Sequence, residues 1–460
     1  MLIETILRRS SSYLTIMMNS ILFSKRSLNS YPLFIQSYAE IKKAAAKANK
    51  DLGCITEEAA GKIISCCDKL KESPQSKIFE TQAWCIDGVD FNFLFNSFIS
   101  AETGVQVDLV NKNQIANDVL QTAQNLTVLK YLDVHMFGVE TLIRALREKS
   151  IEFQDTLHIG RSHMQESLPV TWGGVFGAMA LSIQKALEEI NNVREVFLEV
   201  YLGATPIDQF AVCAPGFSSL AIEYLRRYSH FGLRKPKIDF SNQPNTYYIA
   251  SIEGNDKFVR LLGFLRLLAL NIARISNDLY LYSSGPRCGI SELSLPAIAP
   301  GSTIMPGKIN PSMPELMLQV FHQTMSVDQM ACFSYVEEDI DLEPTNNPVF
   351  FDSLEIVEVI GRGSSKFVEK CVQGISLKPF ENSEHLRNSA SLIAIVRHIF
   401  GNKTASQVAE YCLDRKVSVS TALIELGFAN SNNVSTILGL EKFKNPQEVK
   451  AFLAENGYKD

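Results

Sequence analysis

Residues 301–315, which read GSTIMPGKINPSMPE, carry the most chemically capable side chains in this chain. A glycine, two adjacent hydroxyls, a turn limited by proline, a lysine and an asparagine precede an amphipathic helix. In such a mobile loop Ser302 is a candidate base, Lys308 a cation for a substrate carboxylate and Asn310 an amide donor. The spacing therefore predicts a catalytic loop that acts on a carboxylate.

Two simpler interpretations of this loop compete with catalysis. A phosphate-binding P-loop needs four residues between its glycines and a hydroxyl after its lysine. Here five residues intervene, and Ile309 follows Lys308. A plain helix start is supported by Ser312 and Glu315, which have the S-x-x-E spacing of a capping box. A helix start explains Ser312, but it gives no role to the other hydroxyls, the lysine or the asparagine.

A second candidate is His163 in GRSHMQESLPVT (160–171), a polar segment ahead of a long helical pattern. A lone histidine there could be a surface residue or a donor that caps the helix. The pattern alone favours these structural roles over a catalytic one.

Together these segments resemble the signatures of the aspartase/fumarase superfamily, lyases that form fumarate by removing a group beta to a carboxylate. The loop is similar to GSSxMPxKxNP, and SSGPRCGISELSLP (283–296) is similar to the segment that leads into it. GRSHMQESLPVT is similar to GRTHxQxAxPxT, with Ser162 for threonine and His163 at the histidine. EVYLGATPI (199–207) is close to LGATAIGTG, although residues 208–210 read DQF instead of GTG.

The resemblance implies a role for each residue of the predicted site. Ser302 would abstract a proton beside a carboxylate, creating a doubly charged aci-carboxylate. Lys308 and Asn310 would stabilise it, because donors aimed at developing charge are usually the largest catalytic contribution. His163 would contact a substrate carboxylate and pair with Glu315, which fixes the tautomer and raises the basicity of the imidazole. Further substrate contacts are implied at Thr303, Asn117 and Ser162.

The resemblance is weaker in the N-terminal third of the chain. Where family members carry GxGTSxNMNxNEV, this chain reads GVDFNFLFNSFIS (88–100). The next family motif, VNxSQSSND, becomes VNKNQIAND (110–118), so Ile115 and Ala116 replace two small hydroxyls. Each lost hydrogen bond to a bound carboxylate costs about 1–3 kcal/mol. The residues that this motif keeps are Asn111, Gln114, Asn117 and Asp118.

Composition limits the function classes. With 460 residues, 46% of them apolar, and a net charge of −6, the chain can build a large core and has no basic run. We therefore expect neither nucleic acid nor a membrane as a main partner, and no apolar run reaches the ~18 residues of a membrane helix. Nine cysteines without a C-x-x-C pair favour reduced thiols over a disulfide framework or zinc site. We expect a cytoplasmic protein without a metal or other cofactor. A mitochondrial transit peptide in the first thirty residues is the minority alternative.

Helical patterns dominate the rest of the chain. Apolar residues recur at helical spacing at about 118–150, 167–201, 247–282 and 312–339, and a fifth helix is expected at about 352–373. A shorter helix with a glycine stop is predicted at 37–53. The segment 258–282 is apolar on most of its circumference, and such a helix must be covered on every side. We therefore expect packing between subunits.

These patterns and the resemblance predict a mainly α, three-domain aspartase/fumarase-like fold with a central long-helix bundle. The predicted domains are an N-terminal lyase domain (1–117), a central bundle with the catalytic loop (118–375) and a small C-terminal helical domain (376–460). Family members assemble into homotetramers whose active sites combine motifs of three subunits. The resemblance therefore implies the same assembly here.

Three interpretations of function remain open. An aspartate ammonia-lyase is favoured by the segments 152–163 and 199–207, and a fumarate hydratase by GPRCGISEL and His163. The third is a non-catalytic or retargeted paralogue that acts as a partner subunit of an intact homologue. The first two predict a small dicarboxylate or amino-acid substrate.

Overall fold

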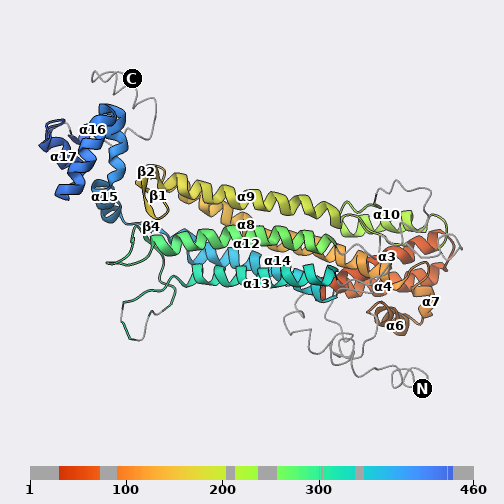
Figure 1. Cartoon of the computed structure of the whole chain (residues 1–460). Helices are drawn as coiled ribbons and strands as arrows, with labels where there is room; N and C mark the ends of the chain where they lie inside the picture. The colour runs from red at the N-terminus through yellow and green to blue at the C-terminus, as the bar shows by residue number, and fades with distance from the viewer. Residues whose placement is uncertain are drawn as a thin grey trace. The chain divides into compact units, whose positions relative to one another are not determined.

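The chain, seen in a computed structural model, consists mainly of α-helices (Figure 1). The structure describes residues 31–72, 91–203, 213–236, 256–299, 301, 304–305, 307–336, 347–432 and 434–438. None of the helices in these ranges combines the length and the hydropathy needed to cross a lipid bilayer. The predicted mainly α fold is confirmed.

Five long helices match the five that apolar periodicity predicts. They are α8 (Ala116–Glu152), α9 (Trp172–Phe197), α12 (Asp256–Tyr282), α13 (Ser312–Val336) and α14 (Asn347–Lys370). One predicted boundary is wrong, because the helix expected from residue 167 begins at Trp172 and the residues before it form a strand. The predicted helical residues 247–255 and 337–339 lie outside the described part of the chain.

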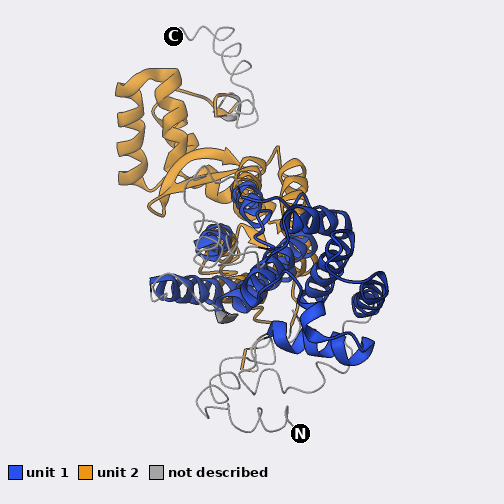
Figure 2. Cartoon of the chain, turned by 90° about the vertical axis from the view of Figure 1, so that its right-hand side faces the viewer, with its two compact units in different colours: residues 1–138, 186–270, 320–362 blue, residues 139–185, 271–319, 363–460 orange. Residues whose placement is uncertain are grey.

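The chain divides into two compact units, coloured separately in Figure 2. Unit 1 comprises residues 1–138, 186–270 and 320–362, and unit 2 comprises residues 139–185, 271–319 and 363–460. The three-domain division expected from the sequence stays a prediction.

Unit 1 contains the N-terminal helices. They are α3 (Tyr31–Asp51), α4 (Glu57–Glu72), α6 (Phe91–Thr103) and α7 (Val107–Val110), with α10 (Phe217–Ser229) packed on α3. α3 begins ahead of the helix predicted at 37–53 and ends at Asp51, and Gly53 follows with a φ of +69°, which fits a glycine stop. Within the unit, Arg266 of α12 forms an ion pair with Asp328 of α13 at 2.6 Å, and Gln323 of α13 donates to Glu355 of α14 at 3.0 Å. These bonds join three long helices.

Unit 2 contains all the described strands. β1 (Leu157–Ser162) pairs antiparallel with β2 (Gln165–Thr171), and β3 (Leu293–Ser294) pairs antiparallel with β4 (Ser376–Leu377). The remaining elements are η3 (Val372–Gly374), α15 (Pro379–Asn388), η4 (Ala390–Leu392), α16 (Ile393–Arg415), α17 (Val419–Glu425) and α18 (Val434–Ile437). α16, α17 and α18 enclose a small apolar core of their own. Asn271 of α12 donates to the backbone of Ser182 of α9 at 3.2 Å, which joins two long helices in this unit.

Burial along α12 corrects one expectation. The segment 258–282 was expected to need covering by other subunits, but the single chain buries most of its apolar side chains, including Leu261, Leu265 and Ile272. A stripe of α12 stays exposed and mixes leucines with polar residues. Its large apolar members are Leu267, Leu270, Tyr280 and Leu281. Only this stripe remains as an apolar surface of α12 for another subunit.

Candidate functional site

The predicted catalytic loop is pinched at its base. A Cβ atom at Gly301 would lie 1.3 Å from the carbonyl oxygen of Lys308, so only glycine fits this position. The backbone N–H of Lys308 donates to the carbonyl of Met305 at 3.2 Å, and Gly307 has a φ of +87°, which closes a tight turn before the lysine. Ser302 and Thr303 lie outside the described residues.

The loop leads directly into α13. Lys308, Asn310 and Glu315 are all exposed, and their side chains make no hydrogen bond or ion pair with the described part of the chain. The helix begins at Ser312 as the sequence predicts, but the capping box is not formed. The Ser312 hydroxyl lies 3.5 Å from the carbonyl of Asn310, and the backbone N–H of Glu315 donates to the carbonyl of Pro311 at 3.2 Å. Because Ser312 is itself the first helical residue, its side chain is not placed to cap Glu315.

His163 lies at the tip of a β-hairpin and not in a loop ahead of a helix. Ser162 of β1 pairs with Gln165 of β2, so His163 and Met164 form the whole connection. Their φ angles are +54° and +61°. Two positive φ values are what a two-residue loop of type I′ requires. The hairpin thus presents an exposed His163 side chain on a short, defined turn.

The predicted pairing of His163 with Glu315 is not formed within the described chain. Both residues belong to unit 2 and both are exposed, yet no hydrogen bond or ion pair joins them there. The structure therefore places both His163 and Glu315 at the surface without bringing these two side chains together.

A buried cluster at the base of the hairpin was not predicted. Glu292 has a fully buried side chain, and Arg161 of β1 binds it with two hydrogen bonds of 2.5 and 3.0 Å. His385 Nδ1 lies 3.0 Å from the same carboxylate, and His158 Nδ1 lies 3.6 Å from it. Burial raises the pKa of Glu292, but the adjacent His158, Arg161 and His385 outweigh burial and hold it at about 2. Glu292 is therefore a carboxylate at any physiological pH.

The same cluster ties the hairpin to its surroundings. Trp172, the first residue of α9, is fully buried, stacks on His158 with ring centres 3.9 Å apart and donates to Asn382 of α15 at 2.8 Å. Asn382 in turn donates to the backbone carbonyl of Glu292 at 2.9 Å. On the other strand, Glu166 accepts hydrogen bonds from Ser389 and from the backbone of Ala390, both at 2.8 Å. These contacts hold the strands that present His163.

The signal for this cluster was present in the sequence. Arg161 stands two residues before His163 in GRSH, and Glu292 stands in GPRCGISEL, the segment that leads into the catalytic loop. A single buried acid and a single arginine do not identify each other over 131 positions, so sequence reasoning missed the pair.

Asn117, the remaining predicted site residue, belongs to unit 1 and lies in the first turn of α8. Its neighbour Asp118 is buried and accepts hydrogen bonds from the backbone N–H groups of Gly203 at 2.6 Å and Ile115 at 2.9 Å. Burial raises the pKa of Asp118 to about 7 against the effect of these donors. Asp118 thus joins the motif at 110–118 to the Gly203 segment.

The other retained residues of that motif are also structural. Asn111 accepts hydrogen bonds from Lys42 at 3.1 Å and from Asn96 at 3.0 Å, and Gln114 accepts from Lys42 at 3.0 Å. Ile115 and Ala116, the replaced hydroxyls, are half-buried at the start of α8. Asn111, Gln114 and Asp118 of this motif therefore support the backbone, whereas Ile115 and Ala116 have no side-chain donor.

No cluster of three or more histidine, cysteine, aspartate or glutamate side chains that could hold a metal ion occurs among the described residues.

Known proteins resemble this chain in sequence and in fold. A family model described as Lyase matches residues 17–326. The chain is 29% identical to the class II fumarate hydratase of Chlamydia trachomatis, over 87% of this chain and 88% of that protein. It is 28% identical to the aspartate ammonia-lyase of Escherichia coli K12, over 92% of this chain and 90% of that protein.

Solved structures agree with these sequence similarities. The crystal structure of a fumarate lyase:delta crystallin protein from Brucella melitensis bound to cobalt has a TM-score of 0.83 and 26% identity, and the match covers 92% of this chain and 96% of that one. The class II fumarase of Schistosoma mansoni, with a TM-score of 0.78 and 24% identity over 92% and 96% of the two chains, shares the fold.

Proposed function

Because the chain belongs to the lyase family of the aspartase/fumarase superfamily, we propose that it converts aspartate to fumarate and ammonia. The substrate would be a small dicarboxylate amino acid. To bind its two carboxylates, the site needs cations and hydrogen-bond donors that are not already bound to other residues.

One observation carries the proposal. His163, Lys308 and Asn310 are exposed, and their side chains have no partner in the described part of the chain, while the backbones that present them are constrained. Gly301 is packed against Lys308, and Arg161 is bound to the buried Glu292 below His163. Side chains left free on a well-supported backbone are what ligand binding needs, because little ordering remains to be done when the ligand arrives.

The proposed elimination begins with proton removal from the Cβ atom of aspartate, and we assign this step to the alkoxide form of Ser302, which takes the proton and becomes a hydroxyl. The electron pair of the broken C–H bond moves into the adjacent carboxylate, which becomes a doubly charged aci-carboxylate. Lys308 and Asn310 stabilise that charge as it forms. The pair then returns to form the Cα–Cβ double bond while the C–N bond breaks, and the protonated amino group leaves as neutral ammonia. His163 holds a substrate carboxylate during these steps.

Ultraviolet absorbance of fumarate tests the proposal directly. The purified chain should form fumarate from aspartate faster than from malate. Ser302→Ala should lower kcat by about 10²–10⁴-fold, the usual contribution of a positioned base. Ser312→Ala, a matched change at a hydroxyl with only a 3.5 Å contact, should leave kcat close to that of the parent chain. If Ser302→Ala retains near-parental turnover, this mechanism does not operate here.

Fumarate hydration is the second candidate. The fumarate hydratase of Chlamydia trachomatis and the aspartate ammonia-lyase of Escherichia coli are almost equally similar to this chain, at 29% and 28% identity. The proposed site residues serve either reaction, because in both the leaving group departs from the carbon adjacent to the one that loses the proton. Turnover of malate but not aspartate would assign the chain to this reaction.

A partner-subunit role is favoured by the motif at 110–118. Ile115 and Ala116 cannot donate hydrogen bonds from their side chains to a ligand, whereas the exposed residues of unit 2 can. In a tetramer with composite sites, this chain would supply Ser302 and His163 to a homologue with an intact first motif. To test this role, the chain is mixed with a homologue whose first motif is intact but whose own loop serine has been replaced by alanine. Fumarate formation by the mixture, but by neither protein alone, would support this role.

A further inference from the structure

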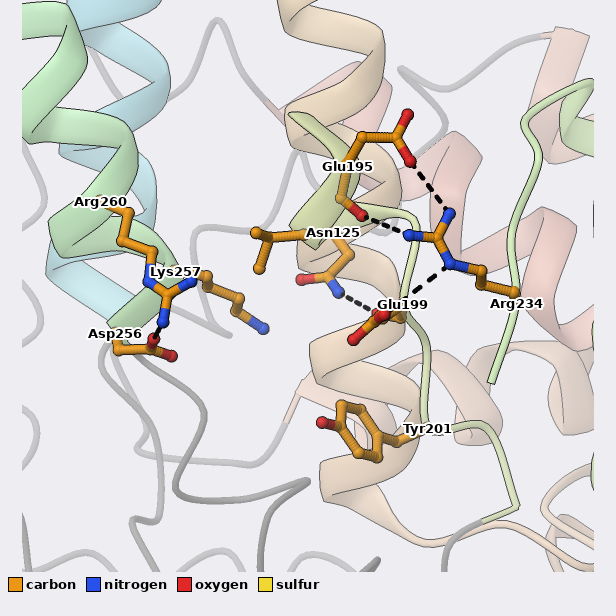
Figure 3. Close-up of a pocket in the computed structure, with 9 residues that line it drawn as sticks. Asn125, Glu195, Glu199, Tyr201, Arg234, Asp256, Lys257 and Arg260 are labelled. Carbon is orange, nitrogen blue, oxygen red and sulfur yellow. Dashed lines mark hydrogen bonds and ion pairs between the residues drawn. The ribbon is translucent and has the colours of Figure 1, made fainter. Parts of the chain in front are cut away.

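Unit 1 contains a pocket of about 400 Å³ (Figure 3). It lies at the N-terminal end of α12, and α8, the end of α9, the segment directly after α9 and Arg234 after α10 complete its walls. The charged residues that line it are Glu195, Glu199, Arg234, Asp256, Lys257 and Arg260. A volume of this size accommodates a small ligand.

Most of these charges neutralise each other. Arg234 forms ion pairs with Glu195 at 3.1 Å and Glu199 at 3.7 Å, and Arg260 forms one with Asp256 at 2.8 Å. These three ion pairs occupy all three acidic residues and both arginines that line the pocket. Lys257 is the exception among the charged residues that line it.

Lys257 is only 4% exposed and makes no hydrogen bond or ion pair with the described part of the chain. Its ammonium lies 5.4 Å from the centre of the Phe258 ring. Burial lowers the pKa of Lys257 to about 7, although the adjacent Asp256 carboxylate acts in the opposite direction. A buried ammonium without a partner is costly, so an anion placed beside it would be strongly favoured.

Asn125 supplies a second unsatisfied group in the same pocket. Its Nδ2 donates to the backbone carbonyl of Glu199 at 2.7 Å, which fixes the orientation of the amide. Its Oδ1 is buried and accepts no hydrogen bond from the described residues. Figure 3 shows Lys257 extending from α12 toward Asn125. The pocket thus contains one unused cationic donor and one unused acceptor.

We infer that this pocket binds a small, singly charged oxyanion that also carries a hydroxyl group. The oxyanion accepts hydrogen bonds from Lys257, and the hydroxyl donates to Asn125 Oδ1. With three cationic and three acidic residues lining the pocket, Lys257 supplies the only unpaired charge among them, which favours a monoanion over a dianion. Dihydrogen phosphate and a 2-hydroxymonocarboxylate share this chemistry.

Titration calorimetry on the full chain tests the inference with four probes. Inorganic phosphate and glycolate carry both functions, whereas sulfate and acetate lack the hydroxyl at neutral pH. One phosphate or glycolate should bind per chain, at least tenfold more tightly than sulfate or acetate respectively. Preference for phosphate over glycolate would identify a phosphate site, and the reverse a hydroxycarboxylate site. Equal affinity for glycolate and acetate would overturn the role of Asn125.

Variants separate the two contacts. Lys257→Met should abolish binding of all four probes, and Asn125→Leu should remove the preference for glycolate over acetate. Lys185→Met, at an exposed lysine, is the matched control and should bind as the parent does. Circular dichroism checks that each variant is folded. Unchanged glycolate binding by folded Lys257→Met would overturn the inference.

A measurement on the unaltered chain covers the case in which Lys257→Met does not fold. Because Lys257 is only partly protonated near pH 7, glycolate should bind with proton uptake at pH 8. The uptake is measured as a dependence of the binding enthalpy on the ionisation enthalpy of the buffer. The other groups that face Lys257 are Glu195, Glu199, Tyr201, Arg234, Asp256 and Arg260. Binding without proton uptake at this pH, or no glycolate binding at all, would contradict the inference.

Discussion

Two regions of the molecule match the signatures of the family to different extents. In the motif at 110–118 of unit 1, Asn111, Gln114 and Asp118 make hydrogen bonds that support the backbone, while Ile115 and Ala116 stand where the similar family motif carries two hydroxyls. In unit 2, the hairpin and the predicted catalytic loop have both supporting contacts and exposed polar side chains, namely His163, Lys308 and Asn310. The comparison teaches that a motif can preserve its fold without its chemistry. Motif similarity in unit 1 is therefore evidence for the backbone alone.

A buried carboxylate anchors each region, and the two are stabilised differently. Glu292 in unit 2 meets Arg161 and His385, and its pKa stays at about 2. Asp118 in unit 1 meets backbone N–H groups, and burial raises its pKa to about 7. His158, Arg161 and His385 together outweigh the desolvation of Glu292, whereas backbone N–H groups and the charge of Lys42 do not outweigh the desolvation of Asp118.

Removing the charge of Glu292 should have the largest effect. Glu292→Gln leaves the mostly buried Arg161 without its counter-charge, and breaking such a pair costs about 3–5 kcal/mol of unfolding free energy. Chemical denaturation measures this loss. Glu369→Gln is the control, because hydrogen bonds from Lys366 and Lys370 also hold the pKa of Glu369 at about 2, but its side chain is exposed. Equal denaturation midpoints for the two variants would refute the anchoring role of Glu292.

Truncating Lys308 should damage activity without damaging the fold. Lys308→Ala removes the proposed stabiliser of the aci-carboxylate, and loss of such a group lowers kcat by about 10²–10³-fold. Because Lys308 is exposed and its side chain has no partner in the described part of the chain, the denaturation midpoint should not move. Lys403→Ala, at another exposed lysine, should change neither quantity. A parallel loss of stability and activity would make Lys308 a structural residue.

Restoring the lost hydroxyls should repair unit 1 in part. Ile115→Ser combined with Ala116→Thr should tighten binding of succinate, an unreactive dicarboxylate, by about 1–3 kcal/mol for each recovered hydrogen bond. Calorimetry measures the change. Ile151→Ser adds a hydroxyl at an exposed position near the other end of α8 and should leave succinate binding unchanged. No gain in the double variant would mean that these positions do not face the ligand.

The free energy of unfolding should depend on pH in opposite directions through Glu292 and Asp118. This is the smallest of the expected effects. The lowered pKa of Glu292 contributes stability that is present above pH about 4.5 and is lost as pH falls toward about 2. The raised pKa of Asp118 makes stability fall as pH rises from about 4 to about 7, because the folded chain holds its proton longer than the unfolded chain. Asp118→Asn should remove that decrease from denaturation curves measured across this range. A decrease that persists in Asp118→Asn must come from another group.

The sequence predicted the parts of the fold that repeat a local pattern. Apolar spacing located α8, α12, α13 and α14, because a long amphipathic helix carries its own signal over many residues. The β1–β2 hairpin was missed because its turn consists of His163 and Met164 and lacks the Asn-Gly or Asp-Gly signal of type I′ turns.

The candidate site was predictable only where its residues lie within one short sequence motif. The exposed positions of His163 and Lys308 follow from segments that can be read locally. The anchor at Glu292 could not be found in this way, because its partners Arg161 and His385 are 131 and 93 positions away. No periodicity connects residues at such separations. The pairing of His163 with Glu315 came from the resemblance alone, and in this chain it remains a prediction.

The close approach of Gly301 to Lys308 brings the two ends of the loop together. Because the loop starts and ends at nearly the same point, the position at which α13 begins does not depend on how many residues lie between Gly301 and Lys308. Insertion or exchange there changes the loop-closure entropy only slowly with length. The closed base therefore tolerates a change in the length of this loop, provided that Gly301 and the proposed base Ser302 stay.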